Sequence, residues 1–401
     1  MGIGVTFVVP RSTGEGISGH VKVIGTGDIH ANPSEEAEYY SHVKALRVNV
    51  TLSPYERPEW SSEYIEERHR NEHKSVTGKF ADKADLGQEL YGRNLFEQIA
   101  EYAESAKYIA ETEQFDVIHV HDWMTFLAGI EARKVSGKPL VVHVHSTEYD
   151  RGGGWSTNQM VYDIERTGLH EADRIIAVSN RTKQVIVDKY AIPAEKVSVV
   201  YNAIDNCDYT IDNSVKHRLK RKTVLFLGRI TLQKGPEYFL QSARKVLDKE
   251  PDVTFVMTGD GDMMHRMVRL AADLKIGHRV IFTGFQSGLA LDRIYDMADL
   301  YVMPSVSEPF GITPLEAMSH EVPVIISKQS GVSEVVKHAL KVDFWDTDKL
   351  ASNIIALLRY GEVRGMLKQN GKSEMRGFSW DNSATQCIGV YSGVTGKVMR
   401  A

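Results

Sequence analysis

Two basic residues follow an apolar run in the middle of the sequence. The run Thr223–Leu227 leads directly into Gly228 and Arg229, and Lys234 follows Arg229 five residues later. In open α/β sheets, ligands bind beyond the carboxyl ends of the strands. A guanidinium and an ammonium placed there could bind a diphosphate, the first as a two-pronged donor and the second as a point charge. The alternative is that both residues are solvated surface charges.

A second candidate site is the segment 307–318, which reads SEPFGITPLEAM and contains two glutamates eight residues apart. Glu308 is predicted to lie in a loop, where its carboxylate could accept hydrogen bonds from sugar hydroxyls. Gly311 precedes a predicted helix whose first N–H groups and positive dipole end could face a phosphate.

The same segment also has a purely structural interpretation. Thr313 is expected as the N-cap, Pro314 as the first helical residue and Glu316 as the third, which together would form a capping box. In that interpretation Glu316 stabilises the helix and contacts no ligand.

The run Gly259-Asp260-Gly261-Asp262 follows another predicted strand. Its Asp-x-Asp pattern could hold a divalent ion with a diphosphate, and its glycines would let a nucleotide approach the backbone. Alternatively, the glycines serve only the turn, and Asp262 caps the helix that follows it.

Histidines occur in pairs at the ends of two further predicted strands. His119 and His121 form one pair, and His143 and His145 form the other. Residues i and i+2 of a strand share a face, so each pair could chelate a metal such as zinc, which suggests a metal-dependent hydrolase as one hypothesis. The alternatives are hydrogen bonds to neighbours for the imidazoles and a helix-capping role for Asp122.

The candidate site residues are positioned by apolar strands, which alternate with helical patterns along most of the chain. Uniformly apolar strands separated by helices indicate parallel sheets covered on both faces. A polar gap at 205–222 separates two such series, which predicts two doubly wound α/β domains facing across a cleft, while the charged stretch 53–93 is expected to form a surface excursion. The predicted strands are Val5–Val9, Asp116–Val120, Leu140–Val144, Arg174–Val178, Val197–Val200, Thr223–Leu227, Val253–Thr258, Val280–Thr283, Leu300–Met303 and Val322–Ile326.

Composition excludes several function classes. The 401 residues are 42% hydrophobic and 25% charged, with a formal net charge of −5, which argues against binding to nucleic acid or acidic lipid. Two cysteines cannot staple a chain of this size, and no apolar run approaches the length of a membrane helix. The sequence predicts a soluble, cytoplasmic protein with no integral membrane segment.

Taken together, the motifs resemble the retaining glycosyltransferases of the GT-B fold, specifically family 4 and its glycogen and starch synthase-like branch. The resemblance covers most of residues 110–395. It implies an N-terminal acceptor-side domain over 1–205, a nucleotide-sugar-binding domain over 206–377 and a closing helix over 378–401 that returns to the first domain. The segments that support it are HVHDW (119–123), HVHSTEYDRGG (143–153), ADRIIAVSN (172–180), VVYNAID (199–205), LGRITLQKG (227–235), GDGD (259–262) and SEPFGITPLEAM (307–318).

The resemblance also implies roles for individual residues. Arg229 and Lys234 would stabilise the departing nucleoside diphosphate, Glu308 would contact the hydroxyls of the transferred sugar, and Glu316 would contact the ribose. His145 would lie beside the anomeric carbon, and Asp122 on the acceptor side. The donor-binding set would consist of Gly228, Gly259, Asp260, Phe310, Gly311, Ile312, Thr313, Pro314, Leu315 and Glu316.

Members of the family need no metal or other cofactor, because the two cations take the place of an ion. The expected reaction moves glucose from ADP-glucose or UDP-glucose to a glucan or another glycan. Two alternatives stay open: a non-catalytic nucleotide-sugar-binding homologue, and a sugar-nucleotide epimerase of the same fold.

One departure from the family concerns the first residues. The family opens with a strand, a Gly-Gly-Leu-Gly-type loop and a helix before the segment that resembles Gly4–Pro10, and this sequence lacks that opening. The glycines at 14 and 16 follow the wrong strand to replace it. We therefore expect weak nucleotide binding and slow or no turnover.

Overall fold

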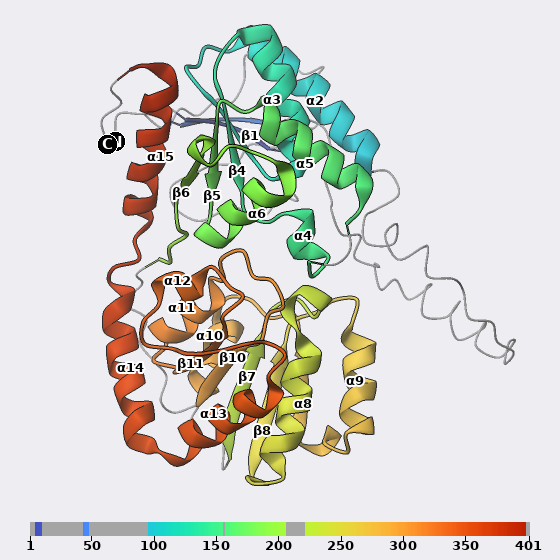
Figure 1. The fold of residues 1–401 in the computed structure, drawn as a ribbon, viewed down its shortest axis with the longest axis vertical. Coiled ribbons are helices and arrows are strands. Elements are labelled where there is room, and N and C mark those ends of the chain that lie inside the picture. The colour runs from blue at the N-terminus through green and yellow to red at the C-terminus, as the bar shows by residue number, and fades with distance from the viewer. Residues whose placement is uncertain (1–4, 10–42, 48–94, 155–156, 206–220, 398–401) are drawn as a thin grey trace, which may run out of the picture.

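The computed structural model describes residues 5–9, 43–47, 95–154, 157–205 and 221–397. Figure 1 shows two stacked halves, each built on a parallel sheet with helices around it. The predicted excursion 53–93 and most of the predicted linker 205–222 lie outside the described residues. The boundaries at 205 and 377 stay predictions.

The sheet of the N-terminal half has four parallel strands in the order β3-β4-β5-β6. β3, β4 and β5 are each followed by helical structure that crosses back over the sheet, as the alternating pattern predicts. The strands are β3 (Ile118–His121), β4 (Leu140–Val144), β5 (Arg174–Ala177) and β6 (Val197–Val199). The helices are α2 (Leu95–Thr112), α3 (Trp123–Ser136), α4 (Glu148–Arg151), α5 (Gln159–Glu171), α6 (Asn180–Tyr190) and the short η1 (Ala194–Lys196).

The sheet of the C-terminal half has six parallel strands in the order β12-β11-β10-β7-β8-β9. The chain starts this sheet in the middle, at β7, and later returns to β7's other side with β10, so the strand order reverses between these two neighbours. This doubly wound order is typical of nucleotide-binding sheets, whose ligands bind where the order reverses. The strands are β7 (Lys222–Leu227), β8 (Val253–Thr258), β9 (Val280–Gly284), β10 (Leu300–Met303), β11 (Val324–Ser327) and β12 (Leu340–Val342).

The helices of this half cover both faces of its sheet and bury two apolar clusters, one on each face. Every predicted strand is present, with ends within two residues of the prediction, and only β2 and β12 were not predicted. The helices are η2 (Leu232–Lys234), α8 (Pro236–Leu247), α9 (Met264–Asp273), η3 (Gly277–Arg279), α10 (Leu289–Met297), α11 (Thr313–Ser319), α12 (Val332–Val335), α13 (Thr347–Arg359) and α14 (Gly361–Met375).

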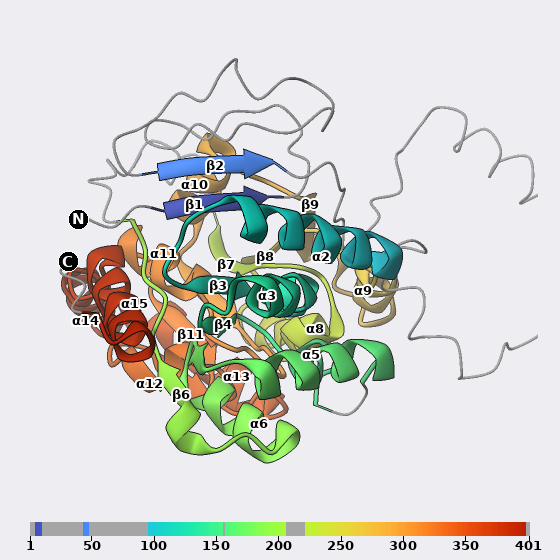
Figure 2. The same ribbon diagram turned by 90° about the horizontal axis from the view of Figure 1, so that it is seen from above.

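Strands β1 (Val5–Val9) and β2 (Val43–Arg47) pair with each other in parallel and form a separate two-stranded sheet. Figure 2 shows the two strands side by side above α2. The Tyr102 hydroxyl of α2 donates a hydrogen bond of 3.0 Å to the carbonyl oxygen of Val8. This bond anchors the small sheet to the N-terminal half.

The last described helix returns to the N-terminal half. After α14, which packs on the C-terminal half, α15 (Trp380–Thr395) runs along the N-terminal half (Figure 1). Its Val390 and Val394 pack against buried residues of β4 and β5. The Ser383 hydroxyl of α15 donates to the carbonyl oxygen of Tyr201 at 2.8 Å, which ties the start of α15 to the segment that follows β6.

No helix among the described residues has the length and apolar character required to traverse a bilayer.

Two loops of the C-terminal half pack backbone against backbone. Gly259, which directly follows β8, has φ +131°, and a Cβ at this position would overlap the carbonyl oxygen of Gly228. The amide of Ile230 donates to the carbonyl oxygen of Asp260 at 2.9 Å, and the amide of Met263 donates back to that of Ile230 at 3.0 Å. The position of the Gly228–Arg229 loop therefore depends on a glycine at 259.

We predict that Gly259→Ala destabilises the protein by about 2–4 kcal/mol, because it combines a strained φ with a steric overlap against backbone. Urea unfolding measures the change. Gly365→Ala in α14 is the matched control, since a Cβ there meets nothing within 4 Å and alanine favours a helix. Equal losses for the two variants would contradict the close approach described here.

Candidate active site

The loops that follow β7 and β10 meet where the strand order of the C-terminal sheet reverses. They form the walls of a pocket, and the side chains of Lys234 and Glu308 meet in its lining. The pocket is lined by Phe226, Leu227, Gly228, Lys234, Met303, Ser305, Glu308 and Thr313. A ligand at this point would contact the two motifs that the sequence singled out independently.

Glu308 is a buried carboxylate, with only 5% of its surface exposed. Its Oε2 accepts hydrogen bonds from the Lys234 ammonium at 2.6 Å and from the Ser305 hydroxyl at 3.0 Å. A carboxylate removed from water needs such partners, because an uncompensated buried charge is strongly destabilising. The pair therefore fixes both the lysine and the carboxylate at the pocket.

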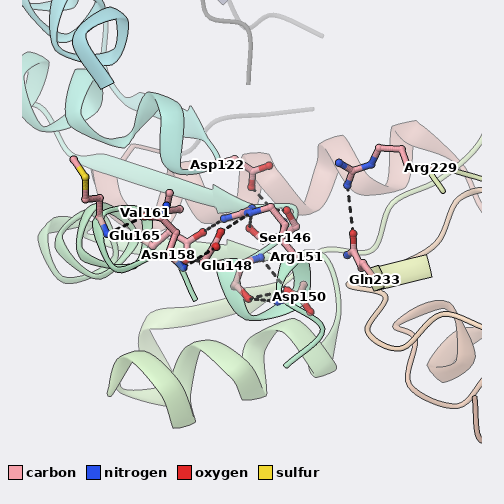
Figure 3. A network of polar contacts seen from close by, with 12 residues as sticks. Asp122, Ser146, Glu148, Asp150, Arg151, Asn158, Val161, Glu165, Arg229 and Gln233 are labelled. Carbon is pink, nitrogen blue, oxygen red and sulfur yellow. Dashed lines mark hydrogen bonds and ion pairs between the residues drawn. The ribbon is translucent and has the colours of Figure 1, made fainter. Parts of the chain in front are cut away.

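Arg229 lies in the loop between β7 and η2. One of its Nη atoms donates to Oε1 of the buried Gln233 at 3.3 Å (Figure 3). Gln233 in turn accepts a hydrogen bond from the amide of Val306 through its carbonyl oxygen, at 2.9 Å. Gln233 thus links the basic loop to the loop of Glu308. Sequence reasoning assigned it no role.

The Glu308 loop is also held by the neighbouring strand end. The amide of Glu308 donates to the carbonyl oxygen of Gln329 at 3.0 Å, and its own carbonyl oxygen accepts from the amide of Gly331 at 2.9 Å. A Cβ on Gly331 would overlap the carbonyl oxygen of Pro309. The loop before α11 is therefore a fixed part of the sheet edge.

Contacts with the N-terminal half hold the same loop from the other side. The Ser307 hydroxyl donates to Oδ1 of the buried Asp150 at 2.7 Å. The Ser179 hydroxyl donates to the carbonyl oxygen of Pro309 at 2.5 Å. From the C-terminal half, Glu334 caps α6 by accepting from the amides of Asn180 and Arg181 at 2.9 and 2.7 Å. The candidate site therefore lies at the junction of the two halves.

The predicted capping box at the start of α11 is wrong. The helix begins at Thr313 after Ile312, and no side chain caps it. The Thr313 hydroxyl pairs instead with the Tyr301 hydroxyl at 2.7 Å, and Glu316 Oε2 accepts from the Tyr295 hydroxyl at 2.6 Å. Both tyrosines are buried and need hydrogen-bond partners, so they take the side chains that the cap would use.

Most of the predicted donor-binding segment around α11 points its side chains into the core. Phe310, Pro314 and Leu315 are buried, and Ile312 is half-buried. Gly311 has φ +102°, and a Cβ there would press against the Glu308 side chain. What these residues can offer a ligand is therefore their backbone, while Thr313 also lines the pocket.

The Asp-x-Asp run is arranged as a turn. Asp260 is exposed, and its Oδ1 accepts from the amide of Gly261 at 2.8 Å. The interpretation of Asp262 as a helix cap is wrong, because α9 begins at Met264 after Met263 without a side-chain cap. Partial burial raises the pKa of the Asp262 carboxyl.

Asp122 follows β3, and the prediction that it caps α3 is also wrong. Its backbone has φ +58°, and its side chain makes no capping hydrogen bond. Instead, Oδ1 accepts from the amides of His145 and Ser146 at 2.7 and 3.3 Å. Burial raises the pKa of Asp122, opposed by the His145 imidazole and by these amides. The aspartate thus positions the loop that presents His145.

Arg151 of α4 supports this loop from beneath (Figure 3). Its guanidinium donates to the Ser146 hydroxyl at 2.8 Å and pairs with Glu148 at 3.0 Å and with Glu165 of α5. The Tyr190 hydroxyl also donates to Glu165. The side chains of Arg151, Glu148 and Glu165 are each at most 7% exposed. Sequence reasoning assigned no role to Arg151, although it lies in the quoted segment 143–153.

The three histidines of β3 and β4 and His145, which follows β4, come together as a group of adjacent rings. His121 and His143 are direct cross-strand partners, and neighbouring ring centroids lie 4.3 to 5.4 Å apart. His121 Nδ1 and His145 Nε2 share a hydrogen bond of 2.9 Å. Burial, together with the neighbouring imidazoles, lowers the pKa of His119 to about 3 and that of His121 to about 4, and lowers the pKa of His143 as well.

Comparison with known proteins identifies the family. Residues 209–374 match the family model of group 1 glycosyl transferases, and residues 84–206 match the Glycosyltransferase Family 4 model. Together the two models cover more than half of the chain. This chain is a glycosyltransferase of these families.

The glycosyltransferase is similar to two other proteins along most of its length. An uncharacterized glycosyltransferase of Methanocaldococcus jannaschii is 33% identical over 310 residues, which are 73% of this chain and 79% of that protein. The alpha-maltose-1-phosphate synthase of Mycolicibacterium smegmatis is 29% identical over 320 residues, 72% of this chain and 81% of that protein. Both matches extend over the two halves.

Solved structures share the fold of this glycosyltransferase. Sucrose-phosphate synthase from Thermosynechococcus elongatus superposes with a TM-score of 0.69 at 20% identity, covering 91% of this chain and 87% of that one. The Anabaena protein HepE, solved with UDP and glucose, gives a TM-score of 0.64 at 20% identity, covering 75% of this chain and 83% of that one. These neighbours confirm the predicted GT-B fold.

We predict that Arg151→Ala destabilises the glycosyltransferase by about 3–5 kcal/mol at neutral pH, because it leaves the buried Glu148 and Glu165 without their cation. Urea unfolding followed by circular dichroism measures the loss. Arg166→Ala is the matched control, since Arg166 is an exposed residue of the adjacent helix α5. An Arg151 variant as stable as the Arg166 variant would show that the network contributes nothing.

Proposed function

We propose that this glycosyltransferase moves a hexose, with glucose as the expected sugar, from a nucleoside-diphosphate sugar to a glycan acceptor and retains the anomeric configuration. The observation that supports the proposal most directly is the 2.6 Å pair of Lys234 and Glu308 at the reversal point of the C-terminal sheet. A cation for the leaving diphosphate and a carboxylate for the sugar lie side by side there.

Lys234 has three N–H donors, so it can keep its bond to Glu308 and donate to a phosphate oxygen at the same time. Arg229 lies in the same loop, and its guanidinium can add a two-pronged contact to the diphosphate. Positive charge held in place where negative charge develops lowers the barrier to departure of the leaving group. In this proposal the two cations make a metal ion unnecessary for transfer.

Glu316 is proposed to accept hydrogen bonds from the ribose hydroxyls. One of its carboxylate oxygens accepts from Tyr295, which fixes the side chain, and the other oxygen can accept from a ligand. Glu316 makes no capping-box hydrogen bond, so the capping role that the sequence suggested does not occupy its carboxylate. His145 would lie beside the transferred sugar, positioned by Asp122, and the acceptor would approach from the N-terminal half.

UDP-glucose or ADP-glucose is the proposed donor, and a glucan or related glycan the proposed acceptor. Two similar proteins support this choice: the Anabaena protein HepE was solved with UDP-glucose, and a Mycobacterium tuberculosis relative, 25% identical over 224 residues, is a glycogen synthase. A thermal-shift screen against ADP, UDP and GDP sugars selects the base, because a ligand that binds only the folded state raises the melting temperature.

We predict that Arg229→Ala and Lys234→Ala each lower kcat/KM for transfer by about 100- to 1,000-fold, the loss expected when one preorganised charge-stabilising donor is removed. Transfer from labelled UDP-glucose and ADP-glucose measures the rate. Proton NMR of the product then reports the anomeric configuration.

Arg269→Ala and Lys249→Ala are the matched controls, since both residues are exposed in the same half of the molecule. Transfer rates that are the same in the site variants and the control variants would refute the proposed roles. Binding of the donor without transfer would instead favour the non-catalytic alternative, and conversion of the donor without an acceptor would favour an epimerase.

Lys234→Ala is also expected to lower stability by about 1–3 kcal/mol, because it leaves the buried Glu308 without its cation. The companion Lys234→Ala/Glu308→Gln variant removes that charge and should recover part of the stability without recovering transfer. Urea unfolding of the three proteins separates the two effects. Recovery of transfer in the double variant would mean that Lys234 acts only as a structural partner of Glu308.

A further inference from the structure

Two parallel neighbouring strands of the N-terminal sheet bring three histidines to one point on one face. His119 and His121 stand two residues apart on β3, and His143 of β4 is the cross-strand partner of His121. One nitrogen from each of these three rings lies within 4.8 Å of the others. Neither His-x-His pair forms such a set alone, and the sheet register unites them.

Several ring nitrogens of this group are buried and have no hydrogen-bond partner among the described residues. His143 is only 7% exposed, and neither of its ring nitrogens has a hydrogen-bond partner among the described residues. Nε2 of His119 is likewise buried without a partner among the residues that the structure describes. Leaving a buried polar group unsatisfied costs about 1–3 kcal/mol, so three such atoms at one point require an explanation.

The remaining contact of His119 leaves Nε2 available for a metal in one of the two tautomers of the ring. Its Nδ1 lies 2.6 Å from the Tyr391 hydroxyl oxygen of α15. If Nδ1 carries the proton and donates to that oxygen, the lone pair is on Nε2, which is the atom without a partner. Histidines that bind metals commonly donate their other N–H to such an outer partner, which orients the ring.

We propose that His119, His121 and His143 bind one divalent transition-metal ion of the zinc class through their imidazole nitrogens. Imidazole suits zinc and its neighbours, and three histidines with one open position form a known type of zinc site. Zn–N bonds of about 2.0–2.1 Å place tetrahedral ligands about 3.4 Å apart. The ligand nitrogens, which now lie within 4.8 Å of one another, therefore have to approach by up to about 1.4 Å, a movement within reach of side-chain rotation.

The proposed ion is separate from the proposed transfer chemistry, which uses Arg229 and Lys234. It would cross-link β3 with β4 and, through Tyr391, orient the group toward α15. His145 bonds to His121 and would be held by it, so the ion would lie next to the proposed sugar site without taking part in the reaction.

Zinc binding to the full-length chain, with any affinity tag removed, tests the proposal. Isothermal titration with ZnCl₂ should give one site per chain, and the melting temperature should rise with zinc because the ion binds only the folded state. Titration with Co²⁺ should produce visible absorption bands typical of a tetrahedral site. These readouts do not depend on whether the chain transfers sugar.

Variants of the ligands locate the ion. His121→Ala and His143→Ala should each weaken zinc binding at least about 100-fold, and Tyr391→Phe about 10-fold, the range known for outer partners of metal ligands. His121 is exposed, so its variant is expected to keep the fold even if the His143 variant does not. His265→Ala is the control, since His265 is an exposed histidine of α9.

Three outcomes would overturn the proposal. The first is the absence of a stoichiometric zinc site in the unsubstituted chain. The second is zinc affinity that His121→Ala and His143→Ala leave unchanged. The third is an equal loss in His265→Ala, which would indicate general surface binding by histidines.

Discussion

The removal of the Glu308 carboxylate from water is the constraint on which the arrangement of the site depends. A charge at 5% exposure requires a cation and hydrogen-bond donors, and Lys234 and Ser305 supply them. The bond from Lys234 to Glu308 therefore ties the loop after β7 to the loop after β10. The same loop then bonds through Ser307 and Pro309 to the N-terminal half. One electrostatic requirement thus organises both sides of the junction.

The fold was largely predictable because most strands are buried on both faces and are therefore apolar along their whole length. Val253–Thr258 is an example, and its predicted bounds match β8. The strands that the prediction missed lie where this pattern fails. β12 spans only three residues and has Lys341 at its centre, and β2 includes Lys44 and Arg47. Short or charged strands are recognised only through their partners in the sheet.

The helix-capping predictions failed at the site because partners distant in sequence bind the side chains that would form the caps. Thr313 and Glu316 match a capping box in sequence, but two buried tyrosines take their side chains. Asp122 stands before a helix, yet its carboxylate turns to the amides of the next strand's loop. Arg151 was missed because its partner Glu165 lies on another helix, and nothing in the spacing links the two. The positions of Arg229 and Lys234 were predictable, since strand ends can be located from sequence, but their partners were not.

The bond of 2.8 Å from Ser383 to the carbonyl oxygen of Tyr201 ties the start of α15 to the segment that follows β6. The hydrogen bond between Ser307 and Asp150 joins the Glu308 loop to the N-terminal half at a different place. A rotation of the halves that breaks the second bond and keeps the first would uncover the Glu308 loop, since Ser307 lies next to Glu308 in that loop.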